Sequence, residues 1–119
     1  GVQTCALPIL VSSSWRWYVE HCLRELGMYE DAAVIVTGSD GLPLKPAPAP
    51  YQAAARVFRP APPGAVLAVE DSGSGVRSAV AAGLACAAVY NPDSGAQDLS
   101  PARWRLNSLY ELPALLDGN

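Results

Sequence analysis

Two acidic residues, Glu70 and Asp71, stand side by side directly after the short apolar run 65–69. Adjacent carboxylates repel each other unless a cation or a base offsets their charge. Oxygen ligands of this kind suit Mg²⁺, which usually takes one or two carboxylates together with water and a substrate phosphate. The pair therefore predicts a metal site. The alternative is a turn over residues 73–75 that Asp71 caps, with Glu70 in solvent.

Three consecutive serines, Ser12, Ser13 and Ser14, follow an earlier apolar run and lead into a predicted helix. Hydroxyl groups and free backbone N–H groups at the start of a helix favour a bound phosphate. Simple capping of the helix by Ser14 explains the same residues without a ligand. The serines therefore predict either a phosphate-binding loop or a helix N-cap.

A single lysine, Lys45, lies in a Lys-Pro-Ala-Pro segment. Most lysines keep their charged end in water, which is the simplest expectation for this one. The neighbouring prolines restrict the backbone, however, and so can hold the lysine side chain in one direction. Lys45 is therefore a candidate for phosphate binding and catalysis.

The elements that must position these residues follow from an alternation of short, almost continuously apolar runs with amphipathic stretches. This pattern is typical of strand-helix-strand units in a parallel sheet covered by helices on both faces, which predicts an α/β fold. The expected strands are 7–11, 33–37, 65–69, 85–90 and, with the weakest pattern, 104–106. A last helix is expected from about Ser108. The apolar stripes of the helices are Val19, Cys22, Leu23 and Leu26; Tyr51, Ala54, Ala55 and Phe58; Val76, Ala79, Val80 and Gly83; and Leu109, Leu112 and Leu116.

In open parallel sheets, ligands bind at the carboxyl ends of the strands. The serines, Lys45 and the acidic pair each come after a different predicted strand. We therefore expect all three groups to meet at one edge of the sheet.

Together, the segments LVSSS, LKPAPAPYQAAA and VLAVEDSGSGVRSAVAAGL resemble the β-phosphoglucomutase-like and phosphoglycolate phosphatase-like branch of the haloacid dehalogenase superfamily, over residues 10–116. The resemblance implies a three-layer, Rossmann-like core and Mg²⁺-dependent phosphoryl transfer from a small phosphorylated metabolite through a phospho-aspartate. It assigns phosphate binding and catalysis to Ser12 and Lys45, further phosphate contacts to Ser13 and Ser14, and Mg²⁺ binding to Glu70 and, more surely, Asp71.

The sequence departs from that pattern in one decisive way, because it contains no Asp-x-Asp motif. In the resembled family this motif near the N-terminus supplies the attacking carboxylate, and a helical cap usually selects the substrate. We therefore expect this chain to be a core domain that is truncated at its N-terminus and lacks the cap. We also expect the chain alone to be inactive. A smaller departure is Ala49, where relatives often have an acidic residue.

Two other functions fit parts of the sequence. The first is a binding or regulatory module of the same fold that naturally lacks the nucleophile. The second is a small Rossmann-type nucleotide binder, suggested by Gly73-Ser74-Gly75. The nucleotide motif is incomplete, since Ser78 stands at the third glycine position and the acidic pair would repel a pyrophosphate.

The first nine residues, GVQTCALPI, are predicted to be non-native, which leaves 10–119 as the partial core domain. The codons GGA GTT CAG ACG TGT GCT CTT CCG ATC encode this peptide, and that string resembles a widely used sequencing-adapter oligonucleotide.

Composition excludes several classes of partner. The formal charge of -3 and the absence of a Lys/Arg cluster argue against binding to nucleic acid or an anionic membrane. No apolar run approaches the roughly 18 residues that span a bilayer. The three cysteines form no C-x-x-C pair, which fits neither a zinc site nor a disulfide framework and is typical of a reducing cytoplasm.

Overall fold

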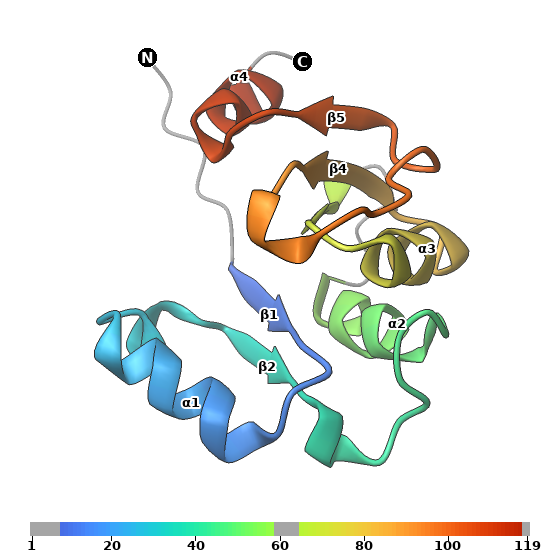
Figure 1. Cartoon of the computed structure of the whole chain (residues 1–119). Helices are drawn as coiled ribbons and strands as arrows, with labels where there is room; N and C mark the ends of the chain where they lie inside the picture. Colours follow the sequence, from blue (N-terminus) through green and yellow to red (C-terminus); the bar gives the residue numbers. More distant parts are fainter. Residues whose placement is uncertain (1–7, 59–64, 118–119) are drawn as a thin grey trace.

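The strands of the protein are all parallel and fall into two small sheets. A computed structural model describes residues 8–58 and 65–117. One sheet pairs β1 (Ile9–Val11) with β2 (Val34–Val36), and the other has β4 (Ala85–Val89) between β3 (Leu67–Glu70) and β5 (Trp104–Leu106) (Figure 1). The α/β class with parallel strands is confirmed. The single sheet that the sequence suggested is replaced by two, because β1 and β3 each pair along one edge only within the described residues.

Helices connect and cover these strands. Helix α1 (Arg16–Glu25) joins β1 to β2, and α3 (Gly73–Ala81) joins β3 to β4. Helix α2 (Ala49–Ala55) packs against both strands of the first sheet and also against α3, which lies on β3 and β4. Figure 1 shows α1 and α2 on opposite sides of the β1–β2 pair. The short helix α4 (Leu112–Asp117) ends the described chain.

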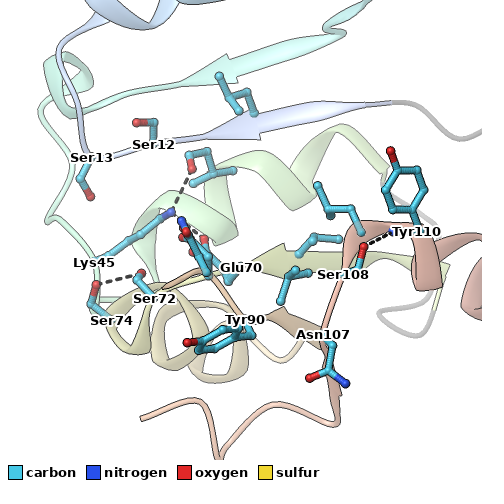
Figure 2. A pocket seen from close by; sticks show the side chains of 17 residues that line it. Ser12, Ser13, Lys45, Glu70, Ser72, Ser74, Tyr90, Asn107, Ser108 and Tyr110 are labelled. Carbon is cyan, nitrogen blue, oxygen red and sulfur yellow. Dashed lines mark hydrogen bonds and ion pairs between the residues drawn. The ribbon is translucent and has the colours of Figure 1, made fainter. Parts of the chain in front are cut away.

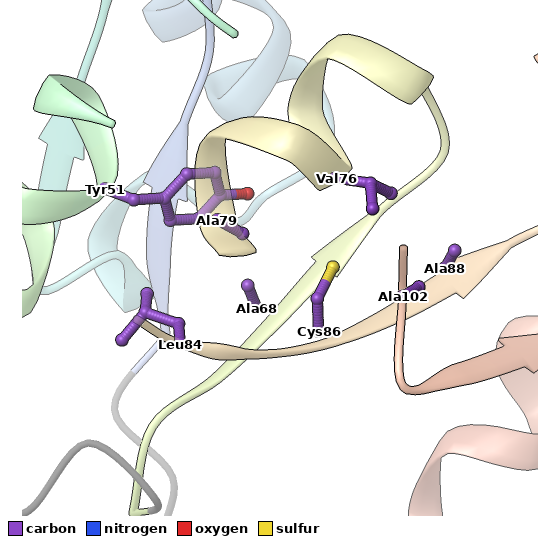
Figure 3. Close-up of a cluster of buried hydrophobic side chains, with 8 residues drawn as sticks. All are labelled: Tyr51, Ala68, Val76, Ala79, Leu84, Cys86, Ala88 and Ala102. Atoms are coloured by element: carbon purple, nitrogen blue, oxygen red, sulfur yellow. The ribbon is translucent and has the colours of Figure 1, made fainter. Parts of the chain in front are cut away.

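The main core lies between α3, α2 and the second sheet (Figure 3). Its side chains are mostly small, so α3 approaches the sheet closely, and Val76 and Ala79 on that helix are fully buried. The cluster consists of Tyr51, Ala68, Val76, Ala79, Leu84, Cys86, Ala88 and Ala102.

The sequence located each of the five strands, including 104–106, to within a few residues. Five of the stripe positions were wrong, because Leu26, Val80, Leu109 and Leu116 are 69%, 42%, 60% and 43% exposed and Gly83 is exposed as well. Leu26 is the C-cap of α1, Gly83 lies beyond the end of α3, and Leu109 and Leu116 lie in the segment that follows the edge strand β5. The expected cap at Ser108 is confirmed, since its hydroxyl accepts a hydrogen bond from the Tyr110 N–H at the start of the 3₁₀ turn Leu109–Glu111.

The segment 1–9, which the sequence predicts to be non-native, lies largely outside the described residues. Within it, Ile9 is the first residue of β1 and pairs with Val34. None of the helices in 8–58 and 65–117 has the length and apolar character needed to cross a bilayer.

Candidate functional site

A cavity of about 820 Å³ lies at the carboxyl ends of β1, β3 and β4, and the segment that follows β5 also lines it (Figure 2). Most of the residues that the sequence singled out reach this cavity; they are Ser12, Ser13, Lys45, Glu70 and Asp71. Ser14 does not line it. The expectation that residues at strand ends meet at one place is therefore correct for three separate segments.

Lys45 joins the ends of two strands that belong to different sheets. Its Nζ lies 2.6 Å from Glu70 Oε2 at the end of β3 and donates to the backbone oxygen of Val11, at the end of β1, over 2.9 Å. The side chains of Lys45 and Glu70 are only 10% and 7% exposed, so this ion pair is largely shielded from solvent. A charge-assisted hydrogen bond of this kind is short and strong. Lys45 is thus held in one direction at the cavity wall.

Glu70 has a second side-chain partner in Tyr51 of α2, whose hydroxyl donates to the same Oε2 atom. Burial, and then the negative charge of Glu70, raise the pKa of Tyr51 far above its usual range, so the hydroxyl remains a donor. The backbone of α3 also approaches this carboxylate. A Cβ at Gly75 would stand 1.9 Å from Glu70 Oε1, so only glycine leaves room for the carboxylate.

Tyr51 was missed as a site residue, because its place in a helical apolar stripe indicated only a core role. The signal that could have found it is its hydroxyl, which needs a partner when the ring is buried.

Asp71 points away from that cluster and is exposed, whereas Glu70 is buried. Glu70 is the last residue of β3 and Asp71 lies in the bend that follows it, so the two neighbouring acids enter different surroundings. Asp71 Oδ2 accepts hydrogen bonds from Asn91 Nδ2 at 2.9 Å and Ser94 Oγ at 3.2 Å. Asp71 Oδ1 accepts none from the described residues.

The alternative in which Asp71 caps residues 73–75 is wrong. The N-cap of α3 is Ser72, whose hydroxyl accepts from the Gly75 N–H at 3.1 Å. The carboxylate of Asp71 is therefore not needed to start this helix.

The serine loop makes backbone contacts with the last residue of β2 and with the segment that follows it. Ser12 N donates to the Val36 oxygen, and Gly38 N donates to the Ser14 oxygen. The Ser12 hydroxyl accepts from Ser14 N over 3.1 Å. These contacts hold Ser12 and Ser13 at the cavity.

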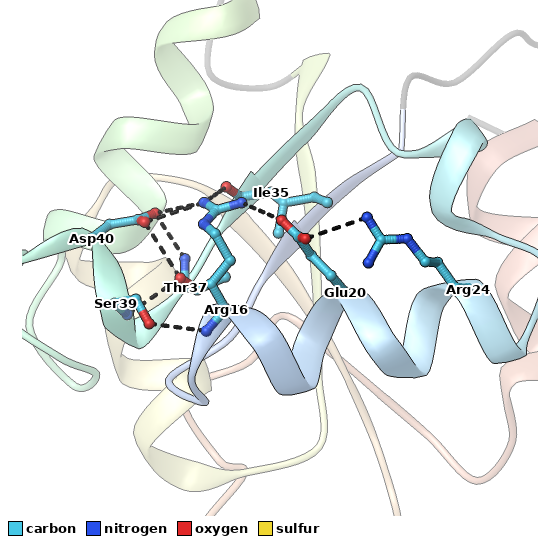
Figure 4. Close-up of polar contacts among 7 residues, drawn as sticks. All are labelled: Arg16, Glu20, Arg24, Ile35, Thr37, Ser39 and Asp40. Carbon is cyan, nitrogen blue, oxygen red and sulfur yellow. Dashed lines mark hydrogen bonds and ion pairs between the residues drawn. The ribbon is translucent and has the colours of Figure 1, made fainter.

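The expected N-cap at Ser14 is wrong, because α1 begins one residue later, with Trp15 as an N-cap that makes no side-chain bond. The cap comes from another segment, since Ser39 Oγ accepts from Arg16 N at 2.9 Å. Arg16 also donates to the Ile35 oxygen and to Asp40, and its ion pair with Glu20 completes the network (Figure 4). The start of α1 is therefore tied to the end of β2.

The site carries one uncompensated negative charge, because Lys45 offsets Glu70 and Asp71 has no cationic partner among the described side chains. Asp71 Oδ1 is a hard oxygen of the kind that Mg²⁺ prefers. Within 8–58 and 65–117, no three His, Cys, Asp or Glu side chains are grouped to hold a metal ion. The described residues thus fit a cation that takes one carboxylate here and its other ligands from water or substrate. The prediction that Glu70 is a further Mg²⁺ ligand stays a prediction. Its Oε2 atom already accepts hydrogen bonds from Lys45 and Tyr51.

Comparisons with known proteins agree on one family. The family model described as haloacid dehalogenase-like hydrolase matches residues 5–83. The protein named "Putative phosphatase YhcW" of Bacillus subtilis (strain 168) is 36% identical over 108 residues, which are 89% of this chain and 48% of that protein.

Solved structures support the same fold. CbbY from Rhodobacter sphaeroides, in complex with xylulose-(1,5)bisphosphate, matches with a TM-score of 0.77 and 30% identity over 86% of this chain and 46% of its own. A haloacid dehalogenase-like protein from Agrobacterium tumefaciens matches in fold, with a TM-score of 0.73 and 24% identity over 92% of this chain and 53% of its own. The chain spans about half the length of these relatives.

Proposed function

Because the chain belongs to the haloacid dehalogenase-like hydrolase family, we propose that it is part of a Mg²⁺-dependent phosphatase or phosphomutase. The substrate class is a small phosphorylated metabolite, and the reaction passes through a phospho-aspartate. The observation that carries the proposal is the position of Lys45, whose ammonium group bonds to the residue before Ser12 and to the residue before Asp71. The Lys45 ammonium group thereby links the segment that carries Ser12 to the segment that carries Asp71, and the proposed reaction needs both.

The charges at the site favour phosphoryl transfer over simple anion binding. A phosphate group brought to Asp71 would meet a carboxylate with no cationic partner among the described side chains, and the two negative charges would repel each other. A divalent cation held by Asp71 would offset this repulsion. Bound there, Mg²⁺ would supply the positive charge that offsets the negative charge spreading over the phosphoryl oxygens.

Each residue of the chain has a distinct part in the proposal. The Ser12 hydroxyl donates to a phosphoryl oxygen, and Ser13, which also lines the cavity, adds a contact from the same loop. Lys45 balances charge between the nucleophile and the phosphoryl oxygens, which is electrostatic stabilisation by a preorganised group. The ion pair with Glu70 keeps this ammonium group in place.

The attacking aspartate is the part that these 119 residues do not supply, because they contain no Asp-x-Asp motif. We therefore propose that this chain by itself does not turn over phosphomonoesters and that the longer gene product does. The relative CbbY is in complex with a sugar bisphosphate, which supports a phosphorylated carbohydrate as one member of the substrate class.

The test is hydrolysis of a generic phosphomonoester with and without MgCl₂ by the 119-residue chain and by the product of the reading frame extended upstream. We expect turnover only from the longer product with Mg²⁺, and its loss in Asp71→Asn. The matched control is Asp98→Asn, an exposed acid outside the cavity. Turnover by the short chain that Asp71→Asn abolishes would overturn the inactivity, and Mg²⁺-independent turnover by the longer product would overturn the metal role.

A further inference from the structure

The loop after β4 holds one oxygen of Asp71 and leaves the other without a partner in the described residues. Asn91 Nδ2 and Ser94 Oγ both donate to Oδ2, at 2.9 and 3.2 Å. Two donors on one oxygen fix the rotation of the carboxylate, because turning it would break both bonds. Sequence reasoning missed these residues, although Asn91 comes just after a predicted strand.

The direction of the Asn91 amide follows from a second contact. Its Oδ1 accepts from the backbone N–H of Asp93 at 3.0 Å, so the oxygen must face Asp93. The amide nitrogen then faces Asp71. Asn91 therefore does two things at once, since the contact with Asp93 also caps the 3₁₀ turn Pro92–Ser94.

The same loop is fastened to the start of α3, the helix that follows Asp71. Gln97 Oε1 accepts from Gly73 N at 2.8 Å, and Gln97 Nε2 donates to the Ser94 oxygen at 2.9 Å. The packing is close, because a Cβ at Gly73 would lie 3.0 Å from the Asp98 oxygen. The donors are thus held in a fixed position relative to Asp71.

We propose that Asn91 and Ser94 are positioning residues that occupy Asp71 Oδ2 and present Oδ1 to a divalent cation. The inference rests on the proposed function and deepens it. Hydrogen bonds from neighbours orient the carboxylates that bind metals, and their removal typically lowers metal affinity by about 10–100-fold. The Asp71 carboxylate is then already oriented before a cation binds, so binding does not have to restrict its rotation.

The test is a titration of the ¹⁵N-labelled 119-residue chain with MgCl₂, followed through the amide signals of Asp71 and its neighbours. The main variant is Asn91→Ser, whose hydroxyl can still accept from the Asp93 N–H but is too short to reach Asp71. A second variant, Ser94→Ala, removes the other donor. The matched control is Ser100→Ala, which removes an exposed hydroxyl of the same region that donates to Asp98.

We expect the dissociation constant for Mg²⁺ to rise about tenfold in Asn91→Ser and to stay unchanged in Ser100→Ala. Equal affinity in wild type and Asn91→Ser would overturn the positioning role while leaving the metal site intact. A wild-type chain that shows no saturable shift at Asp71 would overturn the proposed metal role, and this inference with it.

A second measurement needs no metal and no folded Asn91 variant. The side-chain amide protons of Asn91 in the wild-type chain should exchange slowly with solvent, and they should exchange faster in Asp71→Ala. Fast exchange in the wild type, or no change in Asp71→Ala, would also overturn the proposal.

Discussion

Replacing Lys45 with methionine removes one buried charge and keeps most of the length of the side chain. The Lys45–Glu70 pair is 10% and 7% exposed, and Lys45 also satisfies the Val11 oxygen. The change leaves the Glu70 carboxylate in the interior with the Tyr51 hydroxyl as its only side-chain donor among the described residues. Removing one partner of a buried pair typically costs about 3–5 kcal/mol. The free energy of unfolding of a folded domain is about 5–15 kcal/mol in total, so the variant should lose a large part of its stability.

The matched control is Arg24→Met, which breaks a surface ion pair. Arg24 lies 3.5 Å from Glu20 on the same helix, its side chain is 57% exposed, and its guanidinium stacks on Tyr29. Exposed pairs at this spacing contribute about 0.3–0.5 kcal/mol, and an exposed cation–π contact contributes about 0.5–1 kcal/mol. The control should therefore lose about 1 kcal/mol.

The measurement is urea unfolding followed by far-ultraviolet circular dichroism at pH 7, with the slope m compared between variants. The double variant Lys45→Met/Glu70→Gln adds a second check, because a neutral amide does not leave an unpaired charge inside. It should recover part of the stability lost in Lys45→Met. A loss in Lys45→Met no larger than that in Arg24→Met, or a double variant less stable than the single one, would contradict the stabilising role of the Lys45–Glu70 pair.

Further outcomes follow at three residues, Gly75, Cys86 and Asp40. Gly75→Ala places a methyl group against the carboxylate of Glu70 and should lower the thermal midpoint, since overpacking typically costs about 1–3 kcal/mol. Burial raises the pKa of the Cys86 thiol to about 11, so it should react slowly with a disulfide reagent at pH 8. The unfolding free energy should also fall between about pH 9 and 11, as the unfolded thiol ionises first, and Cys86→Ala should flatten this decline. The hydrogen bond from the Thr37 backbone N–H lowers the pKa of Asp40 in the folded protein. The ionised Asp40 therefore stabilises the fold above the unfolded-state pKa of about 3.9, and this stabilisation is lost as the pH falls further. Asp40→Asn should make the unfolding free energy, measured in urea titrations, depend less on pH in this acidic range.

The positions of the strands, and the arrival of Ser12, Ser13, Lys45, Glu70 and Asp71 at one cavity, could be predicted because they depend on local chemistry. Apolar runs become buried in sheets, so the strand at 85–90 was found without knowledge of its partners. Parallel strands with helical connections align their carboxyl ends, and this brings Lys45 and the acidic pair to one cavity. The composition was enough to argue against nucleic-acid binding.

The tertiary structure alone decided what each polar group does. Glu70 and Asp71 are neighbours with the same charge, and nothing in the sequence separates a buried partner of Lys45 and Tyr51 from an exposed carboxylate held by Asn91 and Ser94. These contacts join residues about 20 or more positions apart, so they exist only once the strands are paired and the helices packed. The cap of α1 was misassigned to Ser14 for the same reason, because Ser39 reaches that helix from another segment. Local sequence determines which backbone can form, whereas the partner of a buried or oriented polar side chain depends on which distant atom the fold brings within about 3 Å.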